Sequence, residues 1–389
     1  MLNENTDIID VTPIETPAYE RNSGNVSGTD KRAGNELAKF RNRNPDFIHK
    51  SLGDLHTFVC GQKERSFARV LSTRDLEVVA DQSFQDQESI KIHSKTSGAL
   101  VDPTHWSFGQ LSARAGAPAG YLRKLPSQLV ADNLNYGLIS REVEELGVLV
   151  EMDETGKAET LRAATGPNYG RIWNQQFTNA IVNSHFGQAD SWGVPMTPSG
   201  KELPCFFASD EDMFIFLTKK TNAIEIENRR NGQSGAGYQG VYFWNSEVGG
   251  GTIGMASFFY DSTCGNRWNY GVKGYTEIKF RHSSQAPTRW MEEMLPVIED
   301  FSDQNTNLLE AQIKAAQQSK IDNVDAWLKG RYGARDAAKY AEAFELDENR
   351  PIESLWDVGT GITAYARRIK NNNERVAVER EAGKILAMA

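Results

Sequence analysis

Cysteine is scarce in this chain, which has only three among its 389 residues. Cys60, Cys205 and Cys264 lie far apart, and an odd number at such spacing suits neither a disulfide framework nor a zinc knuckle. Free thiols are typical of a reducing compartment, so we expect a cytoplasmic protein.

Long apolar runs are missing as well. No stretch approaches the roughly 20 apolar residues that a membrane-spanning helix needs. The first residues, MLNENTDIIDVTP, have neither the basic nor the apolar region of a signal peptide. The sequence therefore predicts no contact with a membrane.

Signatures of catalysis and of cofactor binding are also few. The six histidines are scattered, and the chain has no HExxH pair and no GKS or GKT phosphate-binding loop. Neither Ser-His-Asp nor Cys-His catalysis can be argued from the order of the residues. We expect no metal and no cofactor, and these absences favour a non-enzymatic protein over an enzyme.

Negative charge dominates, but it is unevenly distributed. The formal net charge is -9, which argues against a nucleic-acid coat held by bulk charge. Residues 213–290 nevertheless carry nine Lys and Arg against five acids, so their net charge is +4 and that of the remainder is -13. This segregation favours a basic surface on an otherwise acidic protein.

The pattern along the chain predicts an α+β protein in three parts. Residues 1–50 are polar and lack a sustained apolar period, which is typical of a disordered arm. Residues 51–287 are expected to form an α+β core domain with a mainly antiparallel sheet flanked by helices. Residues 288–389 are expected to form a helical region packed on that core.

Apolar and polar residues alternate in the predicted sheet. Met213–Leu217 is a continuous apolar run, and Ile224–Glu227, Val241–Trp244 and Glu277–Arg281 alternate with a period of two. Such alternation predicts one buried face and one face in contact with water. Lys279 and Arg281 would then lie on the wet face.

Helical spacing marks two regions. Residues 105–145 predict two or three short helices, for which ordinary core packing and DNA reading by a helix–turn–helix are both open. After Pro287, apolar residues recur every three or four positions as far as Ala316. Beyond that point the chain is expected to be helical, with breaks at Gly330, Gly333, Pro351 and Gly359–Gly361.

Two glycine patterns match the dinucleotide-binding fingerprint, one starting at Gly235 and one at Gly249. That chemistry needs a helix directly after the glycines, so that its N-terminus faces the pyrophosphate. Both patterns are followed by strand-like residues instead. We therefore interpret them as turn and bulge glycines.

One pattern resembles metal-dependent nuclease chemistry. Asp261 followed by Glu277 and Lys279 has the acid, then acid-x-lysine, order that some nucleases use to hold Mg²⁺. The same residues on a strand also simply place two charges on one wet face. The nuclease remains an alternative.

Aromatic and basic residues are interleaved between Tyr238 and His282. Aromatic platforms among cations suit single-stranded nucleic acid, because bases stack on the rings while the cations follow the backbone. Two arginines around the turn at Gly166 are further phosphate-contact candidates. The predicted binding residues are Arg162, Arg171, Lys219, Lys220, Arg229, Arg230, Tyr242, Trp244, Arg267, Lys279 and Arg281.

The stretch YFWNSEVGGGTIGMASFFYDSTCGN resembles the signature of the phage/plasmid-like protein family, also called domain of unknown function 932. QLSARAGAPAGYLRKLPSQLVADNLN, LRAATGPNYGRIWN and SLWDVGTGITAYARRIKNNNERVAVEREAGKIL resemble further parts of it, so the likeness runs from about residue 55 to 387. The signature residues here are Asn245, Ser246, Glu247, Gly249 and Gly250.

This resemblance implies a protein of mobile genetic elements without an agreed activity, so no catalytic residue carries over. It favours DNA metabolism or the countering of host defence. We expect a non-enzymatic protein that binds or anneals single-stranded DNA, and such proteins commonly assemble into homo-oligomers. The alternative is an interaction protein that inhibits a host defence enzyme, for example as an acidic DNA mimic.

Overall fold

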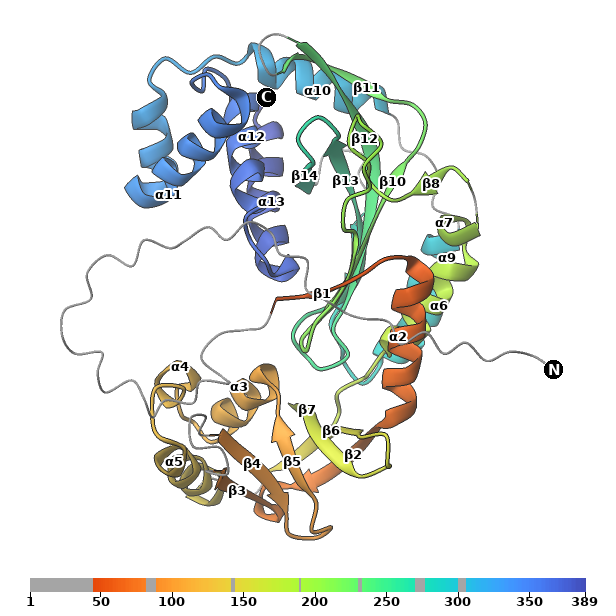
Figure 1. Ribbon diagram of the computed structural model, residues 1–389, viewed down its shortest axis with the longest axis vertical. Coiled ribbons are helices and arrows are strands. Elements are labelled where there is room, and N and C mark those ends of the chain that lie inside the picture. Colours follow the sequence, from red (N-terminus) through yellow and green to blue (C-terminus); the bar gives the residue numbers. More distant parts are fainter. Residues whose placement is uncertain are drawn as a thin grey trace.

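The computed structural model describes residues 45–81, 89–140, 144–188, 190–229, 233–269, 277–299 and 306–389. It confirms the predicted α+β class, with an antiparallel sheet, flanking helices and a helical C-terminal region (Figure 1). Most of the predicted arm lies outside the described residues. Residues 47–49, which the sequence assigned to the arm, form strand β1.

A large sheet occupies the centre of the molecule. Its strands run in the order β1-β9-β10-β12-β13-β14, with β8 on β10, β11 on β12 and β15 on β13, and all pairs are antiparallel. The bounds are β1 Phe47–His49, β8 Trp192–Gly193, β9 Phe206–Ala208, β10 Met213–Lys219, β11 Ile224–Arg229, β12 Gln233–Asn245, β13 Ile253–Asp261, β14 Asn266–Asn269 and β15 Glu277–Phe280.

Helices cover both faces of the central strands of the large sheet, so the prediction of one wet face is wrong there, whereas Lys279 on β15 is exposed as predicted. On one face, Phe243 meets Phe177 of α6 (Asn174–Asn183) edge to face. On the other face, Tyr242 is only 1% exposed, and its hydroxyl accepts a hydrogen bond from Arg380 of α13 (Asn372–Leu386). The alternation is real, but its second face is aromatic and is buried under a helix 138 positions further along the chain.

A second, small sheet lies below the large one in Figure 1. Its order is β2-β6-β7-β5-β4-β3, and only the β5–β7 pair is parallel. The edge strands β2 and β3 are joined by a short 3₁₀ turn at Thr73–Asp75, so the sheet must curl. The bounds are β2 Ser66–Ser72, β3 Leu76–Asp81, β4 Ser89–Ser94, β5 Leu100–Pro103, β6 Glu145–Met152 and β7 Ala158–Thr165.

Within the described residues, three helices pack on the small sheet, and a fourth connects it to the large sheet. The helices α3 (His105–Arg114), α4 (Ala119–Leu122) and α5 (Ser127–Ser140) bury one apolar face against the small sheet. Helix α2 (Leu52–Arg65) leads from β1 to β2 and packs in the core of the large sheet. The helix α7 (His185–Gln188) follows α6.

The C-terminal region is helical, as predicted. It comprises α8 (Ala286–Arg289), a π-helical turn (Trp290–Met294), α9 (Leu295–Glu299), α10 (Thr306–Gln318), α11 (Val324–Glu348), α12 (Leu355–Ala366) and α13. The predicted break at Gly333 is confirmed by its φ of 75° inside α11. No helix within the described ranges is both long and apolar enough to cross a bilayer.

The predicted break at Gly359–Gly361 is wrong, because both glycines lie inside α12. A Cβ on Gly359 would come within 2.4 Å of the Trp268 ring, and one on Gly361 within 2.5 Å of the Tyr340 carbonyl oxygen. These glycines therefore allow close packing of the helix. They do not end it.

Candidate functional site

The signature residues lie in the loop that joins β12 to β13, residues 246–252, which we call the signature loop. Asn245 precedes it and donates hydrogen bonds to the carbonyl oxygen of Ile172 (2.9 Å) and to Oδ1 of Asn174 (2.8 Å). Gly249 has a φ of 88°, a conformation that favours glycine. The glycine pattern is thus a turn followed by strand β13, as interpreted from the sequence.

Glu247 is the charged centre of this loop and is only 3% exposed. Its Oε1 lies 2.6 Å from Nη2 of Arg162 on β7, and its Oε2 accepts the backbone N–H of Asn174 at 2.8 Å. The guanidinium of Arg171 donates to its carbonyl oxygen. Because Arg162 is itself buried, it requires negative charge, which Glu247 supplies together with Glu151, whose Oε2 lies 3.5 Å from Arg162 Nε.

The rest of the signature loop binds the small sheet and its helices. The carbonyl oxygen of Val248 accepts hydrogen bonds from Trp106 Nε1 (3.1 Å) and Gln110 Nε2 (2.8 Å), both on α3. The Tyr169 hydroxyl donates to the carbonyl oxygen of Ser246 at 2.6 Å. The signature loop therefore connects the two sheets. We call its contacts with Trp106, Gln110, Arg162, Tyr169, Arg171 and Asn174 the joint.

His282 packs against two residues beside the signature loop, Tyr169 and Gly170. Its ring stacks on Tyr169 at 5.0 Å, and its Nδ1 lies 3.1 Å from the carbonyl oxygen of Gly170. Burial lowers the pKa of His282 to about 4, and the nearby Arg171 adds to this effect. The ring is therefore neutral at physiological pH.

The depressed pKa of His282 predicts loss of stability in acid. Between about pH 6.5 and 4, His282 is protonated in the unfolded chain but stays neutral in the folded chain. The free energy of unfolding therefore falls as the pH falls. The loss attributable to His282 reaches about 3 kcal/mol at pH 4. Urea unfolding over this range measures it, with His282→Gln as the control. Equal pH dependence in the two proteins would contradict the prediction.

A pocket of about 310 Å³ lies between α13 and the large sheet, and residues of the signature loop form part of its lining. We call it the α13 pocket. Its floor is aromatic, because the rings of Tyr242 and Trp244 stack at 5.0 Å. The lining residues are Asp212, Phe214, Tyr242, Trp244, Asn245, Ser246, Gly250, Gly251, Thr252, Lys279, Asn373, Val376, Ala377 and Arg380.

Two cations at the wall of the α13 pocket share one carboxylate. Glu277 Oε1 lies 3.1 Å from Lys279 Nζ and 2.9 Å from Arg380 Nη2. Arg380 also reaches the Tyr242 hydroxyl at 3.0 Å and lies over the Trp244 ring, 5.6 Å from its centre. Asp212 also lines the pocket, so its two cations face two carboxylates, of which Glu277 is the exposed one that pairs with both. An anion can therefore compete with Glu277 for them.

A glycine makes room for this arrangement. A Cβ on Gly254 of β13 would come within 2.2 Å of the Trp244 indole, which lies flat across the neighbouring strand. The indole Nε1 donates to the Thr252 hydroxyl at 3.0 Å. The ring is thus held at the floor of the pocket and is 8% exposed.

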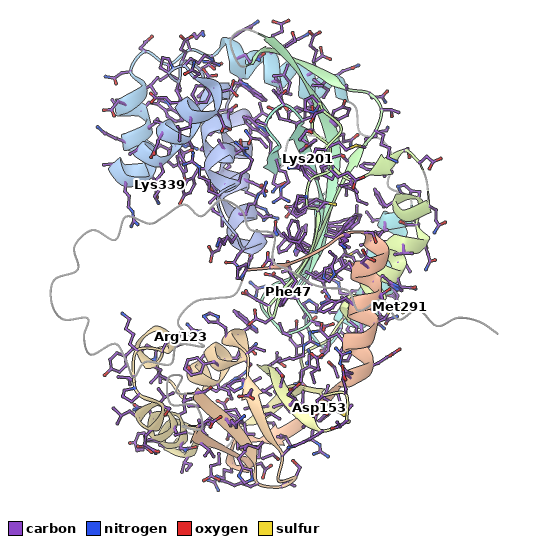
Figure 2. All side chains as sticks on the ribbon, in the orientation of Figure 1. Phe47, Arg123, Asp153, Lys201, Met291 and Lys339 are labelled. Atoms are coloured by element: carbon purple, nitrogen blue, oxygen red, sulfur yellow. The ribbon has the colours of Figure 1, made fainter. Side chains whose placement is uncertain are left out.

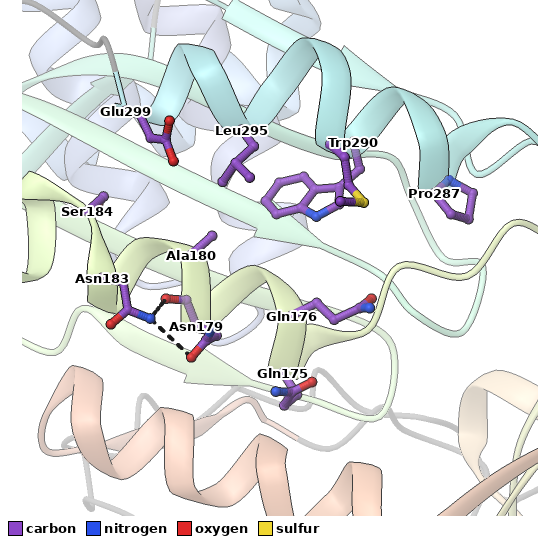
Figure 3. A pocket seen from close by; sticks show the side chains of 11 residues that line it. Gln175, Gln176, Asn179, Ala180, Asn183, Ser184, Pro287, Trp290, Leu295 and Glu299 are labelled. Atoms are coloured by element: carbon purple, nitrogen blue, oxygen red, sulfur yellow. Dashed lines mark hydrogen bonds between the residues drawn. The ribbon is translucent and has the colours of Figure 1, made fainter.

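A larger pocket of about 450 Å³ lies on the opposite face, between α6 and the turn formed by α8, the π-helix and α9 (Figure 3). One wall carries the amides of Gln175, Gln176, Asn179 and Asn183, and the other carries Trp290 and Leu295. Among the described residues that line it, Glu299 alone is charged. Its chemistry does not suit a phosphate.

The structure brings together three of the predicted binding residues: Tyr242, Trp244 and Lys279 line the α13 pocket. Arg162 and Arg171 belong to the joint. Lys220 and Arg281 are exposed, whereas Lys219 is buried. The side chain of Arg229 and the whole of Arg230 lie outside the described residues.

Arg267 is buried beneath α13, so it does not offer its charge to a strand on the surface. Its Nε lies 2.9 Å from Glu379 Oε1, and its guanidinium lies 3.5 Å from the centre of the Phe216 ring. Burial lowers the pKa of Arg267 to about 10, which still leaves it charged at neutral pH. The expectation of an open stacking surface across the sheet is wrong for the same reason, because α13 covers that surface.

The structure does not bring the nuclease residues together. Glu277 pairs with Ala256, five positions from Asp261 along β13, so the two acids are about 17 Å apart and point to opposite faces. Asp261 is also fully buried. Over the described ranges, no group of three His, Cys, Asp or Glu side chains could hold a metal ion.

Arg380 and Asn373 are the site residues that sequence reasoning missed. Both lie on α13, and the signal that could have found them is helical spacing, since Asn373, Val376, Ala377 and Arg380 share one helix face. Known proteins add nothing to this picture. No protein-family model matches the chain, and no curated protein or solved structure does either.

Proposed function

We propose that this protein binds single-stranded DNA without acting on it chemically, and that it serves strand binding or annealing in the DNA metabolism of a phage or plasmid. The α13 pocket carries the proposal, because it combines an aromatic floor with two cations at one wall. The phage or plasmid context of the proposal rests on the resemblance of the sequence to the phage/plasmid-like protein family. A cytoplasmic location follows from the same proposal.

The size of the α13 pocket favours a single strand. At about 310 Å³ it lies at the low end of the roughly 300–1,000 Å³ typical of small-molecule sites, so it suits one nucleotide. A base in a duplex is stacked and paired, whereas a base in a single strand can leave its neighbours at little cost. Lys279 and Arg380 would then hold the adjoining phosphate.

Fluorescence anisotropy with labelled single-stranded DNA and a duplex of the same sequence tests this, over a salt series with and without Mg²⁺. We expect preference for the single strand, and affinity that falls as salt rises because counterions return to the phosphates. Mg²⁺ should produce no cleavage. Lack of binding to either DNA at low salt would overturn the proposal and would favour the alternative, an acidic inhibitor of a host defence enzyme.

A further inference from the structure

The helix α5 has two apolar faces, and only one of them is used inside the chain. Val130, Leu134 and Leu138 are buried in the core of the small sheet. On the opposite side of the helix, Leu129, Tyr136 and Ile139 are 49%, 76% and 62% exposed. At 100° per residue, the centres of these two faces lie about 180° apart. A second apolar face on a surface helix marks a contact site.

The exposed residues follow the spacing of a helix–helix seam. Leu129, Asp132, Tyr136 and Ile139 are separated by three, four and three positions, which is the a/d repeat of packed helices. All four are exposed. We call them the α5 seam.

Charge argues against DNA and for protein as the partner of this seam. Between Ser127 and Ser140 the sequence has no Lys or Arg, so α5 lacks the cations with which a recognition helix holds phosphates. The helix lies on the outer side of the small sheet, away from the large one (Figure 1). The open alternative of DNA reading by residues 105–145 therefore finds no support in this helix.

We propose that the α5 seam is a twofold interface with the α5 seam of a second copy of this chain. In an antiparallel pair related by a twofold axis, facing residue numbers have a constant sum. With the axis near residue 134, Leu129 faces the partner's Ile139, and Asp132 faces the partner's Tyr136. Asp132 then faces the phenol hydroxyl of the partner's Tyr136, which can donate a hydrogen bond to the carboxylate. It does not face the partner's Asp132.

The predicted complementarity is specific to this register. The dimer has two apolar contacts, one at each end of the seam, and two carboxylate–hydroxyl pairs at its middle. A parallel arrangement would place Asp132 against the partner's Asp132, and like charges in contact are destabilising. The seam therefore selects a closed antiparallel dimer and does not lead to an open filament.

The dimer is expected to be weak. A 14-residue helix is about 21 Å long, and one helix–helix contact of that length buries less than the roughly 800 Å² per partner of a standard interface. We expect a dissociation constant on the order of micromolar or weaker. The interface does not depend on the proposed DNA binding, so it is tested without nucleic acid.

Sedimentation of the full chain over a concentration series tests the dimer. The wild type should shift from monomer to dimer, and Ile139→Glu should stay monomeric at every concentration. Leu346→Glu is the matched control, because Leu346 is 66% exposed on α11, outside the seam. A wild type that stays monomeric throughout, or an Ile139→Glu protein that still dimerises, would overturn the proposal.

Disulfide trapping tests the register. In a Cys60→Ser background, a mixture of Leu129→Cys and Ile139→Cys proteins should form the mixed disulfide at least several-fold faster than either protein links to itself. Linkage of Leu129→Cys to itself at the same rate would mean a parallel pair and would contradict the proposed axis. Equal rates for all pairs would mean random collision and would contradict it as well.

Discussion

Glu247→Ala is expected to destabilise the protein by about 2–3 kcal/mol, less than the roughly 3–5 kcal/mol typical of a broken buried ion pair, because Glu151 stays 3.5 Å from Arg162 Nε. The substitution leaves the buried Arg162 guanidinium without the carboxylate 2.6 Å away. It also leaves the Asn174 N–H, at the start of α6, without an acceptor. Both losses fall on the joint, so the two sheets should come apart before either unfolds.

Urea unfolding followed by tryptophan fluorescence measures this effect. Glu247→Gln should be intermediate, because an amide oxygen can still accept from Asn174 but carries no charge for Arg162. The matched control is Glu293→Ala, which removes an exposed carboxylate paired with Arg289 and should not move the midpoint. A Glu247→Ala midpoint equal to that of the wild type would show that the joint does not depend on this charge.

The double variant Lys279→Gln/Arg380→Gln is expected to weaken single-strand binding by on the order of 100-fold at low salt. This corresponds to about 3 kcal/mol for the loss of two charge-assisted contacts to phosphate. The salt dependence should become shallower too, because fewer counterions are released. Anisotropy titrations at several salt concentrations measure both quantities.

Two controls separate this effect from general charge. Lys157→Gln/Lys201→Gln removes the same charge from exposed positions outside the α13 pocket, and this variant should bind as the wild type does. Figure 2 labels Lys201, and it labels Asp153, which lies in the same turn as Lys157. Glu277→Gln should bind several-fold tighter, since it releases both cations from their shared carboxylate. Weaker binding by Glu277→Gln would sink the proposed role of this pair.

Local patterns in the sequence were enough to predict the longer strands of the large sheet, although not β1, β8, β9 and β14. The apolar run at Met213–Leu217 became β10, and the alternation at Val241–Trp244 lies in β12. Period-two alternation reports the pleat of a strand and is independent of what lies above it. It therefore gave the strands correctly but could not say that α13 covers the face of Tyr242.

The candidate site was only partly predictable, for a related reason. Tyr242 and Trp244 lie on β12 and Lys279 lies on β15, and both strands pair with β13. Their aromatic and basic side chains occur within one stretch of the sequence, which is why the sequence indicated them. Arg380 and Asn373 reach the same pocket from α13, and their helical spacing places them on one helix face but does not say which strands that face covers. Arg162 and Arg171 were predicted to contact phosphate, but in the structure both bond to Glu247, a distant residue whose pairing only the fold reveals.

The order of the strands has a consequence for synthesis on the ribosome. The small sheet is built from consecutive residues, 66–165, so it has all its strands as soon as β7 has emerged. By contrast, β1 must wait for β9, because Phe47 pairs with Ala208. At roughly 5–20 residues per second, the small sheet has a few seconds to form while β1 remains without its partner strand. The nascent chain should therefore acquire its first protease-resistant core over residues 66–165, and the preceding strand β1 should be protected only later.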